Sequence, residues 1–91
     1  MKRAIKIKVL GKVQGVFFRA STKKYADQLG VKGWVRNETD GSVQIIAESE
    51  MDNIDRFIKW CYRGPEFAVV EKVIVSDEVE VKNYESFEVR R

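Results

Sequence analysis

Residues 11–19 read Gly-Lys-Val-Gln-Gly-Val-Phe-Phe-Arg, and this stretch decides how the first elements of the chain are joined. It follows a run of alternating apolar and basic residues and precedes a run with helical spacing. The stretch therefore predicts a loop between a strand and a helix. A helix N-terminus leaves backbone N–H groups without partners, and the helix dipole adds positive potential there. Because Arg19 adds a planar fork of donors, we expect the loop to bind an oxyanion, most simply a phosphoryl group.

A plainer interpretation fits the same residues. Gly11 and Gly15 allow the chain to turn, and Arg19 is then a solvated residue of the first helical turn. Glycine turns between strands and helices are common, so spacing alone favours this plainer interpretation. The stretch is neither a Walker-type loop nor a Gly-x-Gly-x-x-Gly fingerprint, because the residues that those motifs require are absent.

The composition indicates one globular domain over residues 1–91. Apolar residues make up 44% of the chain and charged residues 34%, which argues against disorder. No apolar run approaches the roughly 20 residues of a membrane span, and the basic N-terminus alternates instead of forming the apolar block of a signal peptide. We therefore expect a cytoplasmic protein that does not bind membranes.

The residue types that are missing restrict the possible chemistry. The chain has no histidine and one cysteine, Cys61, so an internal disulfide, an imidazole base and most zinc sites are excluded. We expect neither a metal nor a cofactor, and we expect Cys61 to be buried because it lies on an apolar helical stripe. Every charged residue before Asp27 is Lys or Arg. These charges favour anionic ligands, although a solvated strand face would also account for most of them.

Hydrophobic periodicity predicts the order of the elements. Gly30 is expected to cap the first helix and Ser49 the second, whose apolar stripe begins at Met51. The predicted elements are a strand over 4–10, a helix over 18–29, a strand over 31–36, a hairpin turn over 37–41, a strand over 42–48, a helix between Ser49 and Gly64, a strand over 67–75 and a candidate short final strand over 87–90.

This order is βαββαβ with a candidate fifth strand, which is the ferredoxin-like, split βαβ pattern of the α+β class. It predicts an antiparallel sheet with two helices on one face. The first and second strands are joined through a helix, so they run parallel with the third strand between them. The loop ending in Arg19 and the turn beginning at Asn37 then leave the same edge of the sheet. An arginine and an amide can therefore meet at one anion.

Two motifs resemble the acylphosphatase family. Residues 13–19, Val-Gln-Gly-Val-Phe-Phe-Arg, resemble its signature loop, and residues 33–37, Gly-Trp-Val-Arg-Asn, followed by Asp-Gly-Ser-Val at 40–43, resemble its second motif. Gly64-Pro65 with Ala68 and Val70 is similar to its third common stretch. The resemblance covers nearly the whole chain and implies the ferredoxin-like fold, the hydrolysis of acyl phosphates and a single domain.

The resemblance also implies roles for particular residues. The phosphoryl group would be held by the loop residues Gly15, Val16, Phe17, Phe18 and Arg19, and the catalytic residues would be Arg19 and Asn37. Asn37 would orient the attacking water, since a neutral amide does not act as a base at neutral pH. No covalent intermediate and no metal are expected, because phosphoryl transfer is served largely by positioning and charge stabilisation.

Other roles and other functions remain open at this point. Gln14 is expected to brace the loop, while Phe17, Phe18 and Trp34 are expected to be packing residues. The alternative functions are a non-catalytic small-anion or RNA-binding module on the same fold and an enzyme that acts on carbamoyl phosphate, as the similar domain of hydrogenase-maturation proteins implies. The chain's length and lack of zinc motifs favour a free-standing hydrolase. We expect it to be a monomer that takes a small acyl phosphate and binds no nucleic acid.

Overall fold

The computed structural model describes residues 2–77 and 79–91; Met1, the first residue of the expected domain, and Glu78 lie outside the described part of the chain. The described residues form one sheet with two helices. In chain order the elements are β1 (Lys2–Lys12), α1 (Phe18–Leu29), β2 (Lys32–Asn37), β3 (Val43–Glu50), α2 (Met51–Arg63), β4 (Val69–Ser76) and β5 (Phe87–Arg90).

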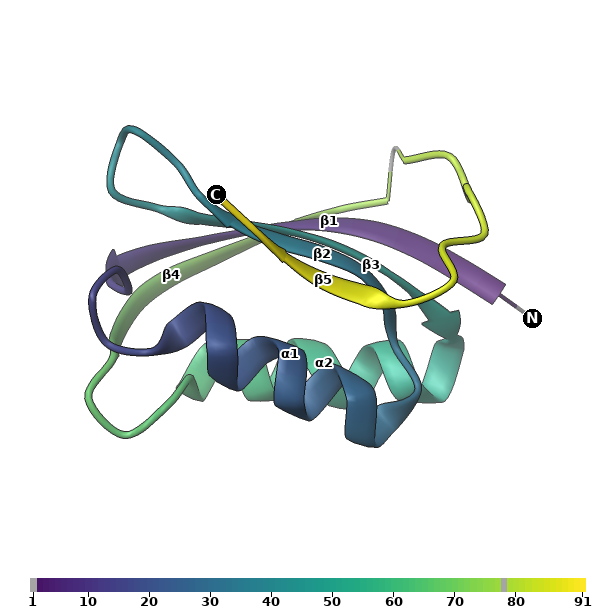
Figure 1. Cartoon of the computed structure of the whole chain (residues 1–91), viewed down its shortest axis with the longest axis horizontal. Coiled ribbons are helices and arrows are strands. Elements are labelled where there is room, and N and C mark those ends of the chain that lie inside the picture. Colours follow the sequence, from purple (N-terminus) through teal and green to yellow (C-terminus); the bar gives the residue numbers. More distant parts are fainter. Residues whose placement is uncertain (1, 78) are drawn as a thin grey trace.

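The molecule has two layers, with both helices packed on the same face of the sheet (Figure 1). Alternate residues of β1 point into the layer between sheet and helices, where Ile5, Ile7 and Val9 are fully buried. They pack with Phe57 and Cys61 of α2 in one apolar cluster. Burial raises the pKa of the Cys61 thiol well above its usual range, so this cysteine is structural, as expected. Neither helix is long and apolar enough to cross a membrane, judged over the described residues.

The strand order confirms the main topological prediction. Across the described residues the order is β4-β1-β3-β2-β5. Both β1 and β2 pair with β3 in the antiparallel sense, so β1 and β2 run parallel with β3 between them. The ends of β1 and β2 therefore lie at the same edge of the sheet, and the loop before α1 lies beside the turn after β2.

The four predicted strands pair in the antiparallel sense, as expected, but the candidate fifth strand makes the sheet mixed, because β5 runs parallel to β2. The chain leaves β4 at one side of the sheet and crosses to the opposite side before β5 begins (Figure 1). Because this crossing starts and ends at the edge where β1 and β2 begin, β5 must run in the same direction as β2. Its last residues, Val89 and Arg90, are thereby brought to the edge where α1 starts.

Two details of the helix ends also differ from expectation. The N-cap of α2 is Glu50, whereas the Ser49 hydroxyl donates to the carbonyl oxygen of Gly30 at 3.1 Å. Ser49 therefore ties the end of α1 to the start of α2 instead of capping a helix. Met51 is 48% exposed, because the first turn of α2 lies beyond the apolar core. Gly30 does cap α1 in the left-handed conformation, as predicted.

A buried carboxylate holds the crossing segment on the sheet. Glu48 of β3 is 1% exposed. Its Oε1 accepts a hydrogen bond from the backbone N–H of Tyr84 at 3.0 Å, and its Oε2 accepts one from the backbone N–H of Lys82. The segment that positions β5 therefore depends on one side chain far away in the sequence.

Replacing Glu48 with alanine should lower the free energy of unfolding by about 2–4 kcal/mol, because two backbone donors lose a charged acceptor. Glu48→Gln, which keeps one acceptor oxygen, should cost less. Urea unfolding would measure both, with the exposed Glu71→Ala on β4 as a control for lost charge. A loss no larger than that of Glu71→Ala would contradict the anchoring role.

Candidate active site

The loop before α1 has an unusual backbone. Gly15 and Phe17 both have positive φ, 74° and 63°, while Val16 between them does not. Alternation of this kind turns successive N–H groups toward one side and forms a concave donor site for an anion. The hydrogen-bond ladder of α1 begins with the Ser21 N–H, which donates to the carbonyl oxygen of Phe17 at 3.0 Å. The N–H groups before Ser21 thus have no partner within the helix.

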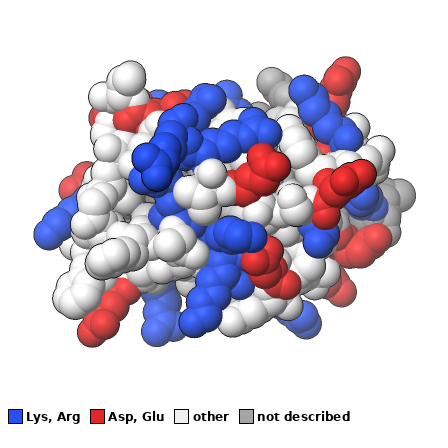
Figure 2. All heavy atoms as spheres, in the orientation of Figure 1, with Lys and Arg blue, Asp and Glu red and all other residues white. Residues whose placement is uncertain are grey.

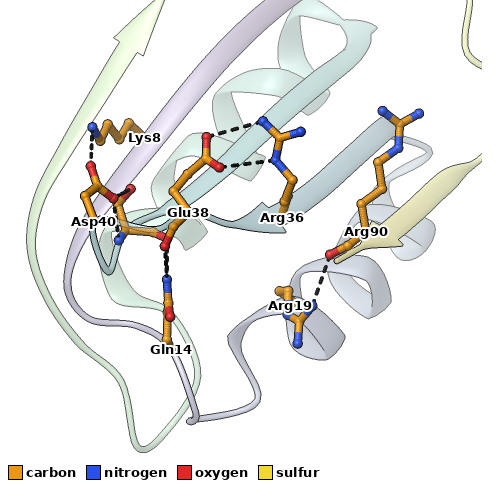
Figure 3. A network of polar contacts seen from close by, with 8 residues as sticks. Lys8, Gln14, Arg19, Arg36, Glu38, Asp40 and Arg90 are labelled. Carbon is orange, nitrogen blue, oxygen red and sulfur yellow. Dashed lines mark hydrogen bonds and ion pairs between the residues drawn. The ribbon is translucent and has the colours of Figure 1, made fainter.

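Arg19 lies in the first turn of α1, and the end of β5 orients its side chain. Its Nη1 donates to the backbone carbonyl oxygen of Arg90 at 3.0 Å (Figure 3). Among the described residues Arg19 has no carboxylate partner and donates no other hydrogen bond. The remaining N–H groups of the guanidinium are therefore open to an anion, while the Arg90 carbonyl fixes the plane of the fork.

Asn37 is the last residue of β2 and lies where the hairpin to β3 begins. The hairpin is closed by the Glu38 N–H, which donates to the Ser42 carbonyl oxygen at 2.9 Å. The side-chain oxygen of Asn37 is buried and accepts no hydrogen bond from the described residues. An unpaired buried acceptor costs about 1–3 kcal/mol, so the packing of the fold alone does not account for this amide.

One pocket of about 310 Å³ brings these groups together. It is lined by Gly15, Arg19 and Asn37, together with Val13, Phe17, Phe18, Ala20 and Val89. A Cβ built on Gly15 would meet no protein atom within 4 Å, so the space beside this glycine is open. The site residues predicted from the sequence are thus gathered around one cavity, apart from Val16, which does not line it.

Gln14 connects the two halves of the site. Its Nε2 donates to the carbonyl oxygens of Glu38 at 2.7 Å and Ser42 at 2.9 Å. Both acceptors belong to the hairpin that follows Asn37 (Figure 3). The sequence predicted that Gln14 braces the loop, and the structure shows that it does so by fixing the loop to the hairpin.

If the chain hydrolyses acyl phosphates, as the sequence resemblance implies, replacing Gln14 with alanine should lower kcat by about 3- to 30-fold, because the two carbonyl oxygens lose their donor and the loop can shift relative to Asn37. Steady-state hydrolysis of an acyl phosphate would measure this, with Lys12→Ala just before the loop as the control. If Gln14→Ala matched wild type while remaining folded, the connection between loop and hairpin would be unimportant for catalysis.

Ion pairs stiffen the hairpin that follows Asn37. Asp40 accepts a charged hydrogen bond from Lys8 at 2.8 Å and bonds to Ser42, and these contacts hold the pKa of the Asp40 carboxyl well below its usual range. Arg36 forms a pair with Glu38. Figure 2 shows Lys and Arg side chains gathered around the part of the surface where the C-terminus lies. Basic side chains on this part of the surface favour the approach of an anion.

Some residues behave differently from the sequence-based expectation. Phe18 is a packing residue at 2% exposure and Trp34 is buried at 8%, as predicted, but Phe17 is 77% exposed and was wrongly expected to pack. Its positive φ turns the side chain away from the core. Sequence reasoning also missed Val89 and the Arg90 carbonyl. A backbone carbonyl carries no signal in the sequence, and β5 was only a candidate strand.

Comparison with known proteins identifies the family. The sequence profile described as acylphosphatase matches residues 5–89. The chain belongs to the acylphosphatase family. A curated acylphosphatase from Rubrobacter xylanophilus is 46% identical over 88 residues, which cover 97% of this chain and 80% of the relative.

Solved structures agree with this assignment to the acylphosphatase family. The structure of an acylphosphatase from Coxiella burnetii matches with a TM-score of 0.93 and 40% identity, over 98% of this chain and 93% of that chain. Full-length HypF, solved in a phosphate- and nucleotide-bound form, matches with a TM-score of 0.92 and 32% identity; the match covers 100% of this chain but 12% of HypF. The ferredoxin-like fold predicted from the sequence is thereby confirmed.

Proposed function

We propose that this chain hydrolyses acyl phosphates, with the phosphoryl group in the pocket between the loop before α1 and the turn after β2. The observation that carries the proposal is that Arg19 and Asn37 line one pocket together with the loop residues Gly15, Phe17 and Phe18. These groups come from two segments that only the fold brings together. Family membership supports the same activity.

In the proposed reaction, water attacks the phosphorus atom as the bond between phosphorus and the carboxyl oxygen breaks. The products are a carboxylate and inorganic phosphate, and the proton of the water passes to a phosphate oxygen. The open N–H groups and the Arg19 guanidinium stabilise the charge on the equatorial oxygens in the transition state. The side-chain amide of Asn37, which lines the pocket, forms a hydrogen bond with the attacking water and so orients it.

The proposed mechanism needs no metal, cofactor or covalent intermediate. A carboxylate is a good leaving group, so positioning and positive charge account for most of the catalysis. Arg19, which has no carboxylate partner among residues 2–77 and 79–91, provides the fixed charge. The same described residues contain no cluster of three or more His, Cys, Asp or Glu side chains placed for a metal.

We further propose that the protein is a cytoplasmic monomer without a nucleic-acid partner. RNA-binding domains of this topology stack bases on exposed aromatic rings of the sheet. Here Trp34 is covered by the guanidinium groups of Arg36 and Arg90, each 4.9 Å from a ring centroid of the indole. The outer face of the sheet therefore offers no open ring for a base at this position.

Hydrolysis of benzoyl phosphate with EDTA present tests the proposed function. We expect turnover by the folded wild-type protein at a rate that EDTA does not change, and acetyl and carbamoyl phosphate would be assayed beside it. The competitive inhibition constant of inorganic phosphate would be measured in parallel. Phosphate binding without turnover of any of the three substrates would reject the hydrolase in favour of an anion-binding module.

A further inference from the structure

Phe17 is the most exposed large apolar residue among those described, at 77%, and it is one of the residues that line the pocket with Arg19 and Asn37. The neighbouring Phe18 is 2% exposed and belongs to the core. Two adjacent aromatic residues thus have opposite environments. The packing of the fold accounts for Phe18 but not for the aromatic ring at position 17.

The backbone makes a phenylalanine at this position costly. Phe17 has φ 63° and ψ 23°, in the left-handed region. Residues with a Cβ rarely adopt this conformation, which glycine adopts freely. Because the ring is exposed, its burial does not offset the strain. The anion site accounts for the left-handed backbone but not for a phenylalanine there, since glycine would adopt it without strain. The side chain at position 17 therefore calls for a role of its own.

Val89 provides a second apolar surface in the same pocket. It lies on β5, next to the Arg90 carbonyl that orients Arg19, and it is 42% exposed. Val13 and Phe18 also line the pocket, but both are already buried, at 1% and 2%. Among Val13, Phe17, Phe18 and Val89, most of the apolar surface that is still exposed to a ligand therefore belongs to Phe17 and Val89.

The pocket is larger than its anion site requires. A phosphoryl group has four non-hydrogen atoms, whereas the cavity measures about 310 Å³, which is at the small end of the range for pockets that hold whole ligands. An acyl phosphate whose phosphoryl group contacts Arg19 must place its acyl group beside that site. The exposed apolar side chains of the same pocket are the surfaces available to receive it.

We propose that Phe17 and Val89 form the acyl-binding wall of this enzyme and give it a preference for acyl phosphates with an aromatic or bulky apolar acyl group over acetyl phosphate. The proposal rests on the proposed function, because it assumes that the phosphoryl group lies at Arg19. The ring face of Phe17 contacts the acyl group, and Val89 contacts it from β5. Neither residue takes part in bond making or breaking, so both determine specificity.

Binding of phosphonates tests the wall without requiring turnover. Methylphosphonate and benzylphosphonate share the anionic group, resist hydrolysis because their C–P bond is stable, and differ in apolar bulk. We expect wild type to bind benzylphosphonate more tightly than methylphosphonate, and we expect Phe17→Ala to reduce this ratio by about 3- to 10-fold. Titration calorimetry would give both dissociation constants. Phe17→Leu should keep part of the ratio, and Phe67→Ala, which removes another exposed aromatic side chain, should keep all of it.

Phe17→Gly provides a variant that is certain to tolerate the backbone conformation. It should lower the ratio as Phe17→Ala does, and its midpoint of thermal unfolding should not fall, because glycine relieves the left-handed strain. A wild-type ratio near one, or a ratio that Phe17→Ala and Phe17→Gly leave unchanged, would overturn the acyl-binding wall. Equal weakening of both phosphonates would also overturn it, since Phe17 would then act on the anion site alone.

The two proposals fail in different ways. If wild type bound benzylphosphonate preferentially through Phe17 but hydrolysed no acyl phosphate, the apolar wall would stand and the hydrolase would be rejected. If it hydrolysed benzoyl and acetyl phosphate with equal kcat/KM and Phe17→Ala changed both equally, the hydrolase would stand and the preference would be rejected. A kcat/KM ratio of benzoyl to acetyl phosphate that falls in Phe17→Ala, as the phosphonate ratio does, would support both.

Discussion

Arg19→Ala should lower kcat/KM for acyl phosphate hydrolysis by about 10³- to 10⁵-fold, the range that a single arginine contributes to phosphoryl transfer elsewhere. The reason is structural. The guanidinium is fixed by the Arg90 carbonyl at 3.0 Å, has no carboxylate partner among the described residues and lines the pocket. Arg19→Lys should recover only part of the loss, because lysine keeps the charge but not the planar fork.

Lys24→Ala is the matched control for Arg19→Ala. It removes one positive charge from the same helix, at an exposed position outside the pocket that holds Arg19. The comparison separates the oriented guanidinium from the general positive field, which should change kcat/KM by less than about tenfold. Steady-state kinetics on proteins shown by circular dichroism to be folded would measure both. If Arg19→Ala retained activity close to that of Lys24→Ala, the phosphoryl group would not be held as proposed.

Asn37→Ala should lower kcat by about 10²- to 10³-fold, as expected for the loss of one oriented hydrogen bond in the transition state. The KM should change little, because Arg19 and the loop N–H groups still hold the phosphoryl group. The free energy of unfolding should stay within about 1 kcal/mol of wild type or rise, since the substitution removes a buried acceptor without a partner.

The combination of lost activity and retained stability is the diagnostic result for Asn37. Thr39→Ala, in the exposed part of the same hairpin, controls for a general effect on the turn and should keep nearly full kcat. If Asn37→Ala lost activity only in proportion to a loss of stability, Asn37 would be a residue of the hairpin and not a catalytic one. Urea unfolding and steady-state kinetics on the same preparations would distinguish the two.

Local patterns predicted most of the fold, and long-range contacts explain what they missed. Ile5, Ile7 and Val9 alternate in the sequence and are all buried in one layer, so period-two patterning was sufficient for β1. The direction of β5, by contrast, was not predicted from local patterning. It depends on the segment between β4 and β5, which Glu48 fixes through the backbone N–H groups of Lys82 and Tyr84. Such contacts to the backbone leave no pattern in the sequence.

The site could be predicted where side chains carry the chemistry. The topology placed Arg19 and Asn37 at the same edge of the sheet, and one pocket contains both. The Arg90 carbonyl could not be predicted, because any residue presents a carbonyl. Phe17 was misassigned because an apolar residue beside Phe18 suggests packing, and only the left-handed backbone turns its ring outward.

The measurement that tests the central claim most directly is hydrolysis of benzoyl phosphate in water enriched in oxygen-18, with the products analysed by mass spectrometry. The proposed mechanism predicts one labelled oxygen in inorganic phosphate and none in benzoate, because water held by Asn37 attacks the phosphorus atom beside Arg19. The label in benzoate would contradict it, since water would then have attacked the carbonyl carbon and the loop would have served only to bind the leaving phosphate.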